Sequence, residues 1–448
     1  MVSKATDLLV KGGCVVTVDE EMRFYSPGSV AVDQGRIVAV GPSPEIDKSF
    51  SPERVIDASS KVIMPGLFNC HTHACITYLR GMADDMALYE WLDEKIWPAI
   101  NAQDEEVTYH SVLLGCLEMI RAGITTFCEM CVFTPQVVAA IDESGLRADV
   151  ADEKKNFGDQ TKIPSILAEA ADWYDRFHGS GEGRIRMRIT AHAPYSCTPE
   201  LVRGLLEVAA EREALLKTHL AETQDEVEEI QRDYGVSPTV HMDNLGFLGP
   251  KTLVAHAIWL MDEDIRVFAE RGVTVAHDPT SNMKLTAGIC PVPKLLDQGV
   301  TVGLGTDSVV SNNRLDLFEA MKTTALIHKV VHMDPTLLPA EQVVQLATRG
   351  GAEALGLIEE VGTVEVGKKA DLILVDFDKP HLRPHHLSVP QNVYSHLVYS
   401  AVASDVDTTI VDGHVLMENR RVRSLDEGEV IAQAQRSAES LLRQAGLL

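Results

Sequence analysis

The chain has few basic residues and no long apolar run. Its 448 residues include 40 Lys and Arg against 66 Asp and Glu, which gives a formal net charge of −26. Such a surplus of negative charge repels phosphate backbones and anionic membranes, so a nucleic-acid polymer is not an expected partner. No apolar stretch approaches the roughly 18 residues that span a bilayer, and MVSKATDLLV lacks the basic and apolar regions of a signal peptide. We therefore expect a cytoplasmic protein with no membrane partner.

A disulfide framework is not expected either. The eight cysteines are scattered along the chain, and a chain of this length buries a core without covalent staples. Cys128 and Cys131 form one C-x-x-C pair, but no second pair completes a zinc site. We expect reduced thiols and interpret this pair as small buried strand residues, with a redox or metal role as the less favoured alternative.

Two kinds of hydrophobic pattern are present. Short alternating segments bounded by Gly, Pro and Asp, such as SVAVDQGRIVAVG, fill the N-terminal region and return late in GTVEVGKKADLILVD. This pattern is typical of antiparallel strands. Between them, apolar runs alternate with amphipathic segments such as PELVRGLLEVAAERE, which is typical of repeated βα units and a parallel sheet.

The central region contains eight strand-like runs, the number that closes a (β/α)₈ barrel of the TIM type. They are KVIMPGLFNCHTH, ITTFCEMC, LRADVAD, IRMRITAHAPY, ALLKTHLAE, TLVAHAIWL, TVAHDPTS and TVGLGTDS. We predict an α/β fold with this barrel at residues 63–362 and a small β-sandwich domain formed by residues 1–62 and 363–448.

Nearly every one of these runs ends with a polar residue. The active site of such a barrel lies at the carboxyl ends of its strands, so these residues are expected to converge in one cleft. They are His71, His73, Glu129, Asp152, His192, His219, His256, His277 and Asp307.

Four of them form a possible metal-binding set. His71 and His73 are two residues apart on one strand, so both side chains can face the same ion. Alone, this pair also fits two hydrogen-bonded histidines at a strand end. His219 and Asp307 close the fifth and eighth runs and add an imidazole and a carboxylate, ligands that Zn²⁺ and Fe²⁺ both accept.

The motifs PGLFNCHTH, HLAE, AHAIW and GTDS, in this order, resemble the amidohydrolase superfamily. LRGMADDMALYEWL, HDPTSNMKL and TDSVVSNNRLDLFEAMK resemble its branch of methylthioadenosine/S-adenosylhomocysteine deaminases and s-triazine hydrolases. The resemblance implies that His71, His73, His219 and Asp307 are metal ligands. The fourth run has no lysine that could be carbamylated to bridge two ions. We therefore expect one divalent ion per chain, Zn²⁺ with Fe²⁺ as the alternative.

The resemblance also implies roles for the other site residues. Glu222 would protonate a ring nitrogen of the substrate, although a solvated glutamate that caps the next helix is the alternative. Asp307 would deliver a proton to the departing ammonia, and His256 would orient the attacking hydroxide. His192 would contact the substrate. Trp91 would form an apolar wall over the ring or simply pack an amphipathic helix.

Three acidic residues and one histidine are weaker candidates. His277 and Asp278 could support the residues around the metal. Asp84 and Asp85 could hold the segment after the first strand by ionic contacts, although a solvated acidic pair is the usual reading.

Two places depart from the nucleoside deaminases of this branch. In IWPAIN, Ile100 stands where those enzymes carry a glutamate that binds the ribose hydroxyls, and an apolar side chain leaves such hydroxyls unpaired. Where they use arginines to bind the homocysteine carboxylate, this chain has Asp152, Glu153, Lys154 and Lys155. The lysines could substitute, but Asp152 would repel a carboxylate, so S-adenosylhomocysteine is a doubtful substrate.

We therefore expect a metal-dependent aminohydrolase that releases ammonia from an amino-substituted N-heterocycle, a small molecule of the methylthioadenosine, deoxyadenosine or adenosine type. The alternative is an s-triazine hydrolase that removes chloride, ammonia or an alkylamine, which IHKVVHMDPTLLPAEQVVQLATRGG favours. A non-catalytic scaffold is a remote third hypothesis, because Glu222 and His256 accompany a full ligand set. The resemblance implies a homodimer or homotetramer.

Overall fold

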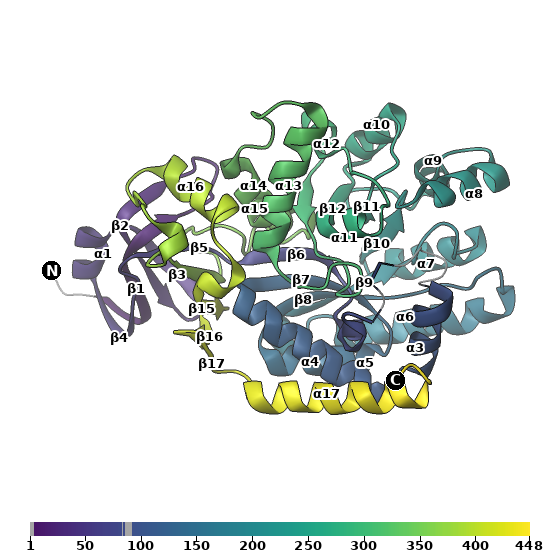
Figure 1. The fold of residues 1–448 in the computed structure, drawn as a ribbon, viewed down its shortest axis with the longest axis horizontal. Coiled ribbons are helices and arrows are strands. Elements are labelled where there is room, and N and C mark those ends of the chain that lie inside the picture. Colours follow the sequence, from purple (N-terminus) through teal and green to yellow (C-terminus); the bar gives the residue numbers. More distant parts are fainter. Residues whose placement is uncertain (1–3, 83, 86–91) are drawn as a thin grey trace. The chain divides into compact units, whose positions relative to one another are not determined.

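The computed structural model describes residues 4–82, 84–85 and 92–448. The chain divides into two compact units (Figure 1). The first unit comprises residues 1–68, 118–126 and 316–425, and the second comprises residues 69–117, 127–315 and 426–448.

An eight-stranded sheet, in the order β13-β12-β11-β10-β9-β8-β7-β6, forms the barrel that the sequence predicts. Its strands are β6 (Leu67–Thr72), β7 (Ile124–Cys131), β8 (Arg147–Asp152), β9 (Ile185–Thr190), β10 (Leu215–Leu220), β11 (Thr252–His256), β12 (Thr274–His277) and β13 (Val302–Leu304). From β8 to β13, neighbouring strands pair in parallel. The backbone N–H groups of Thr306 and Asp307 donate to the His71 carbonyl and draw the end of β13 toward β6.

The strands are apolar because parallel strands of a barrel are covered on both faces. Every residue of β6, β7 and β8 is buried. The helical segments of this unit are η1 (Ala74–Leu79), η2 (Leu92–Ile96), α3 (Trp97–Ala102), α5 (Thr134–Ser144), η3 (Gln160–Lys162), α6 (Ile163–Phe177), η4 (Gly181–Gly183), α7 (Pro199–Glu211), α8 (Gln224–Tyr234), α9 (Pro238–Asn244), α10 (Asp262–Arg271), α11 (Pro279–Lys284), α12 (Val292–Asp297) and α17 (Glu427–Gln444), with most of α4 (Glu105–Ala122).

The C-terminal helix α17 belongs to this same unit and runs beside α3 (Figure 1). Leu441 and Leu442 pack in one buried cluster with Tyr78, Ile96 and Ala99. The burial of these side chains packs α17 against Tyr78 of η1, Ile96 of η2 and Ala99 of α3.

The first unit contains a nine-stranded mixed sheet in the order β17-β16-β15-β14-β5-β1-β2-β3, with β4 paired to β1. N-terminal and C-terminal segments pair in it as the sequence predicts, since β5 lies antiparallel to β14. Its strands are β1 (Lys4–Val16), β2 (Phe24–Asp33), β3 (Arg36–Pro42), β4 (Phe50–Asp57), β5 (Lys61–Pro65), β14 (Leu372–Asp376), β15 (Val406–Val411), β16 (His414–Glu418) and β17 (Arg421–Val422). Its helical segments are α1 (Ser43–Ser49), α13 (Leu317–His332), α14 (Ala340–Ala347), α15 (Arg349–Ala354), η5 (Pro380–Leu382), α16 (Pro390–Tyr399) and η6 (Ala403–Asp405).

One feature of this sheet differs from the antiparallel pattern expected from the sequence. Strand β1 pairs in parallel with both β4 and β5. The chain returns to β1 through β3 and α1, and such a crossover brings a strand back in the same direction. Alternation of apolar residues is the same for either direction and could not distinguish them.

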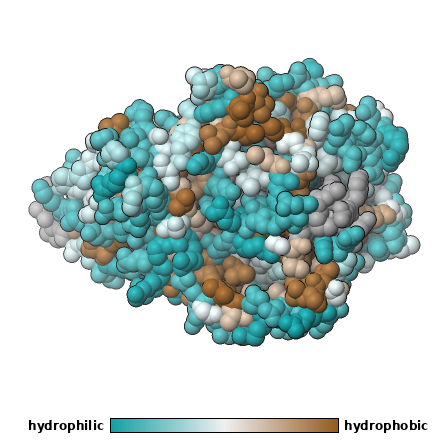
Figure 2. Space-filling view, in the orientation of Figure 1, coloured by the Kyte–Doolittle hydropathy of each residue, from teal (hydrophilic) through white to brown (hydrophobic). Residues whose placement is uncertain are grey.

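The surface is mainly hydrophilic on the face shown in Figure 2, with an apolar patch over α13. Leu326, Val330, Val331 and Met333 form this patch and are between 48% and 85% exposed. Within the described residues, no helix is both long enough and apolar enough to cross a bilayer. All eight cysteines are buried, with free thiols.

Candidate active site

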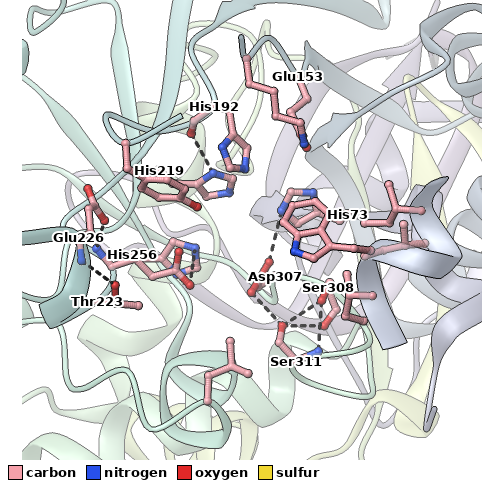
Figure 3. A pocket seen from close by; sticks show the side chains of 18 of the residues that line it. His73, Glu153, His192, His219, Thr223, Glu226, His256, Asp307, Ser308 and Ser311 are labelled. Carbon is pink, nitrogen blue, oxygen red and sulfur yellow. Dashed lines mark hydrogen bonds and ion pairs between the residues drawn. The ribbon is translucent and has the colours of Figure 1, made fainter. Parts of the chain in front are cut away.

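A pocket of about 350 Å³ opens among the loops that follow the carboxyl ends of the barrel strands (Figure 3). Of the residues predicted from the sequence, those that line it are His73, His192, His219, Glu222, His256 and Asp307. His71 is completely buried beside them. Residues at or just after the carboxyl ends of five different strands therefore converge on one cavity, as expected for a barrel enzyme.

Four side-chain atoms are spaced for a single metal ion. The Nε2 atoms of His71 and His219 are 3.2 Å apart, and Asp307 Oδ1 lies 3.4 Å from His71 Nε2 and 3.5 Å from His73 Nε2. Two ligand atoms bound tetrahedrally at 2.0–2.1 Å from Zn²⁺ are separated by about 3.3 Å. Nitrogen atoms of His71, His73 and His219 also lie within 4.8 Å of one another. The residues present thus fit a divalent ion.

Hydrogen bonds orient these ligands. His73 Nδ1 contacts the Met130 carbonyl at 2.8 Å, and His219 Nδ1 contacts the His192 carbonyl at 2.9 Å. A carbonyl at Nδ1 requires a proton there, which leaves each Nε2 with its lone pair toward the site. Burial lowers the pKa of His71 and His219 well below the usual value. Both rings are therefore neutral, which is the form that binds a metal.

The carboxylate of Asp307 is held from the opposite side. Its Oδ2 accepts from Ser281 Oγ at 2.6 Å and from Ser311 Oγ at 2.8 Å, while Oδ1 faces His71 and His73. Asp307 has a φ of 58°, in the left-handed region. A non-glycine residue in that region costs free energy, and such residues gather at functional sites.

His256 is charged by its surroundings. Its Nε2 lies 3.8 Å from Glu222 Oε1, and its Nδ1 lies 3.0 Å from Asn282 Oδ1 and 3.6 Å from Asp278 Oδ2. Burial alone would lower the pKa of His256, but the carboxyl groups of Glu222, Asp278 and Asp307 raise it to about 9. A protonated His256 donates from both ring nitrogens.

Glu222 does not cap the helix that follows it. The cap of α8 is Thr223, whose Oγ1 accepts from the Glu226 N–H. The Glu222 carboxyl group lines the pocket, and burial raises its pKa above the usual value. A carboxyl group that keeps its proton can act as a general acid.

Glu226 is a residue that the sequence analysis missed. Its two carboxylate oxygens accept from the backbone N–H groups of Ala221 and Glu222, both at 2.9 Å. It is buried, and it fixes the short turn that presents Glu222 to the cavity. The two glutamates are four residues apart, one after a strand and one in the next helix. This spacing alone does not predict that Glu226 binds the backbone of the turn.

Three of the residues expected to converge in the cleft do not line the pocket. Glu129 accepts from the N–H groups of Ala74 and Cys75 and so shapes the turn after His73. Asp152 forms an ion pair with Lys154, and His277 is buried without being one of the residues that line the pocket. Side chains alternate along a strand, so the last residue can face away from the cleft.

The wall of the pocket that Trp91 was predicted to form can be described only in part, because Trp91 lies outside the described residues. Ile96, Trp97 and Ile100 line this region. Ile100 thus lies in the pocket wall. This is the position at which the resemblance places a glutamate in the nucleoside deaminases. His192 also lines the pocket, with its Nδ1 at 2.7 Å from Ser196 Oγ, which leaves Nε2 as the nitrogen that can meet a ligand.

An ionic contact holds the segment that leads to these residues. Lys284 Nζ binds Asp84 Oδ1, and the same ammonium donates to the Val310 carbonyl at 2.8 Å. Asp84 therefore makes the ionic contact that the sequence suggested for it, and both Asp84 and Asp85 are exposed.

Comparison with known proteins gives a consistent result. Residues 62–416 match the amidohydrolase family. The chain is 45% identical over 415 residues to a 5-methylthioadenosine/S-adenosylhomocysteine deaminase of Desulforudis audaxviator, which covers 93% of this chain and 95% of the relative. It is 44% identical over 436 residues to a 5′-deoxyadenosine deaminase of Methanosarcina mazei, which covers 97% of this chain and 98% of the relative.

Solved structures share the fold. An adenosine deaminase from Xanthomonas campestris with bound zinc superposes with a TM-score of 0.94 at 33% identity, over 99% of this chain and all of that one. An atrazine chlorohydrolase from Arthrobacter aurescens in complex with zinc gives a TM-score of 0.87 at 24% identity, over 97% of this chain and 100% of that one. At that identity the second likeness indicates the fold alone.

Proposed function

The chain belongs to the amidohydrolase family, and we propose that it hydrolyses the exocyclic amine of an adenine nucleoside and releases ammonia. The observation that carries this proposal is the arrangement of Glu222 and His256 beside the donor set of His71, His73, His219 and Asp307. The named deaminases that cover nearly the whole chain support an adenine ring with a 5′-deoxyribose, 5′-methylthioribose or ribose substituent.

The proposed cofactor is one Zn²⁺ per chain, held by the three imidazole Nε2 atoms and by Asp307 Oδ1. The zinc found in the structurally similar adenosine deaminase supports this choice over Fe²⁺. A bound divalent ion would lower the pKa of water toward neutrality and so supply a nucleophile at physiological pH.

The side chains of this protein then manage the protons. Burial raises the pKa of the Glu222 carboxyl group above its usual value, and we assign to this group the transfer of a proton to the ring nitrogen next to the carbon under attack. Asp307 takes a proton from the attacking water and passes it to the amine, which departs as ammonia. His256, 3.8 Å from Glu222 Oε1, donates to the oxygen that adds to the ring and holds it in line with the carbon.

Hydrolysis of an s-triazine is the second candidate. The apolar wall of Ile96, Trp97 and Ile100 favours it, because a small substituted ring needs no hydroxyl partner there. This alternative uses the same donor set and the same acid, so the chemistry of the site does not separate it from nucleoside deamination.

Ammonia release by the zinc-loaded enzyme tests the proposal. The substrates to compare are 5′-deoxyadenosine, methylthioadenosine, adenosine, S-adenosylhomocysteine, adenine, melamine and atrazine. We expect the highest kcat/KM with an adenine nucleoside. Turnover of a triazine with none of the nucleosides would favour the second candidate instead.

A further inference from the structure

Two charged side chains that the proposed chemistry does not use face the pocket. Glu153 and Lys155 follow β8 and line the cavity. The chain alternates here, so that Asp152 and Lys154 face away, where Lys154 contacts Asp152 and lies 2.7 Å from Glu169. The sequence analysis expected Asp152 near the substrate. Asp152 faces away instead, and Glu153 is the acidic residue that lines the pocket here.

Glu153 and Lys155 form an ion pair inside the cavity. The Glu153 side chain is 12% exposed, and that of Lys155 is 23% exposed. Lys155 Nζ also lies 5.5 Å from the centre of the Trp97 ring, which adds a cation–π contact. Burial alone would raise the pKa of Glu153, but His192, Lys155 and His73 lower it to about 2. Glu153 is thus a carboxylate with few water partners.

The pocket as a whole is acidic. Its lining contains the carboxyl groups of Glu153, Glu222, Asp225, Glu226, Glu229 and Asp307. Among the described lining residues, the single Lys or Arg is Lys155, and Glu153 already pairs with it. On the side of the pocket across from His256, an anionic substituent therefore meets the Glu153 carboxylate, and the cation there, Lys155, is already paired with it.

Glu153 lies on the side of the pocket where a ring substituent would extend. Figure 3 shows Glu153 across the cavity from His256, and Glu222 is the carboxyl group beside His256. A ring held by Glu222 and His256 directs its substituent away from them, toward Glu153 and the wall that contains Ile100. Ile100 has no polar atom for a hydroxyl group, whereas Glu153 has two acceptor oxygens.

We propose that Glu153 accepts a hydrogen bond from a hydroxyl group of the sugar and that the Glu153–Lys155 pair rejects substrates with an anionic substituent. The substrates are then uncharged nucleosides: nucleotides are excluded by their phosphate, and S-adenosylhomocysteine is excluded by the carboxylate of its zwitterionic homocysteine group. This inference rests on the proposed nucleoside deamination.

A cycle of enzyme variants and substrate analogues tests the hydroxyl contact. Wild type and Glu153→Ala are compared on 5′-deoxyadenosine and on its analogues that lack the 2′ or the 3′ hydroxyl. Loss of the contacted hydroxyl should lower the kcat/KM of wild type about tenfold or more. The kcat/KM of Glu153→Ala for 5′-deoxyadenosine should be lower than that of wild type by a similar factor. For this variant, the analogue should give almost the same kcat/KM as 5′-deoxyadenosine. An equal loss in both enzymes would overturn the assignment.

A second variant tests charge selection. Glu153→Gln keeps the shape and removes the charge that neutralises Lys155. We expect kcat/KM for S-adenosylhomocysteine, relative to 5′-deoxyadenosine, to rise about tenfold or more. The matched control is Glu169→Gln, which removes a carboxylate from the Lys154 pair outside the pocket and should leave the ratio at its wild-type value. An unchanged ratio in Glu153→Gln would contradict the proposal.

Two further measurements separate the possible failures. Zinc content and the thermal unfolding midpoint show whether each variant is folded and loaded. Calorimetric binding of adenosine and 2′,3′-dideoxyadenosine to wild type and Glu153→Ala repeats the comparison without turnover. Absence of ammonia release from every nucleoside would refute the proposed function. If the nucleosides are deaminated but removal of the hydroxyl lowers kcat/KM by the same factor in wild type and Glu153→Ala, only the role of Glu153 is refuted.

Discussion

At the scale of single residues, Glu222 is the most direct test of the proposed chemistry. Glu222→Gln keeps the volume and removes the proton that the ring nitrogen requires. We expect kcat for the best nucleoside to fall by about 10²- to 10⁴-fold, with the zinc content unchanged because Glu222 is not one of the four ligands. Steady-state kinetics and metal analysis check both parts.

The control for this variant is Glu228→Gln on the exposed side of α8. It makes the same substitution on the helix that follows Glu222, outside the cavity, and should keep wild-type kcat. Full activity of Glu222→Gln would show that another group protonates the ring.

Removal of the metal gives a second prediction at this scale. Chelation and dialysis should abolish ammonia release, and about one equivalent of Zn²⁺ should restore it. Because the ion binds the folded chain in preference to the unfolded chain, restored protein should unfold about 5 °C or more above the metal-free protein. Parallel additions of Zn²⁺ and Fe²⁺, followed by calorimetry and activity assays, check the choice of ion. Activity that survives complete removal would contradict the proposed mechanism.

The sequence could predict the residues at the carboxyl ends of strands but not all of their directions. His71, His73, His219 and Asp307 come together as the motif spacing predicts. Glu153 and Glu226 were missed because the role of each depends on which way one side chain faces or which turn it contacts. A one-residue change along an extended chain reverses the direction of the side chain, and no motif records it.

At the scale of elements, strands β8 and β9 are joined by a buried ionic cluster. The carboxylate of Asp149 lies 2.7 Å from Arg186 Nε and 2.7 Å from Arg188 Nη2, and Asp149 is completely buried. Burial alone would raise the pKa of Asp149, but the two guanidinium groups lower it below the usual value. The cluster therefore depends on an ionised Asp149.

This cluster predicts a loss of stability in acid. Because the folded pKa lies below the unfolded value of about 3.9, Asp149 stabilises the fold at pH values above that value, and its contribution declines as the pH falls toward the folded pKa. Asp149→Asn removes the carboxylate that Arg186 and the buried Arg188 share and should lower the free energy of unfolding at pH 7 by about 3–5 kcal/mol. Wild type and variant should converge as the pH drops below 4. Urea denaturation across this pH range measures both effects.

The control for that measurement is an ion pair at the surface. Arg184 contacts Asp142, whose side chain is 54% exposed, so Asp142→Asn should cost less than about 1 kcal/mol. Equal losses in the two variants would show that burial of Asp149 does not control its contribution.

The helix α17 shows why one part of the organisation was not predictable. The sequence placed residues 363–448 together on the basis of strand patterns, and the structure groups residues 426–448 with the second unit. An amphipathic helix shows that one face needs a partner without identifying which one. The partner here is the segment of Tyr78, Ile96 and Ala99 beside the pocket. The eight barrel strands were easier to predict because each is a short, nearly continuous apolar run.

At the scale of the whole molecule, the net charge of −26 acts on the approach of ligands. A charged protein attracts or repels ions over about one Debye length, roughly 10 Å at 0.1 M salt, but exerts no net force on a neutral molecule. If the substrate is an uncharged nucleoside, its kcat/KM should change less than about twofold between 0.02 M and 0.5 M NaCl.

An anionic analogue should behave in the opposite way. Adenosine 5′-monophosphate meets both the net charge of the protein and the acidic lining of the pocket. Screening weakens both repulsions, so its inhibition constant should fall as NaCl increases over the same range. Stopped-time ammonia assays with the two ligands at matched salt concentrations make the comparison. A kcat/KM for 5′-deoxyadenosine that fell steeply with salt would contradict the prediction, because an uncharged nucleoside experiences no net attraction that salt could screen.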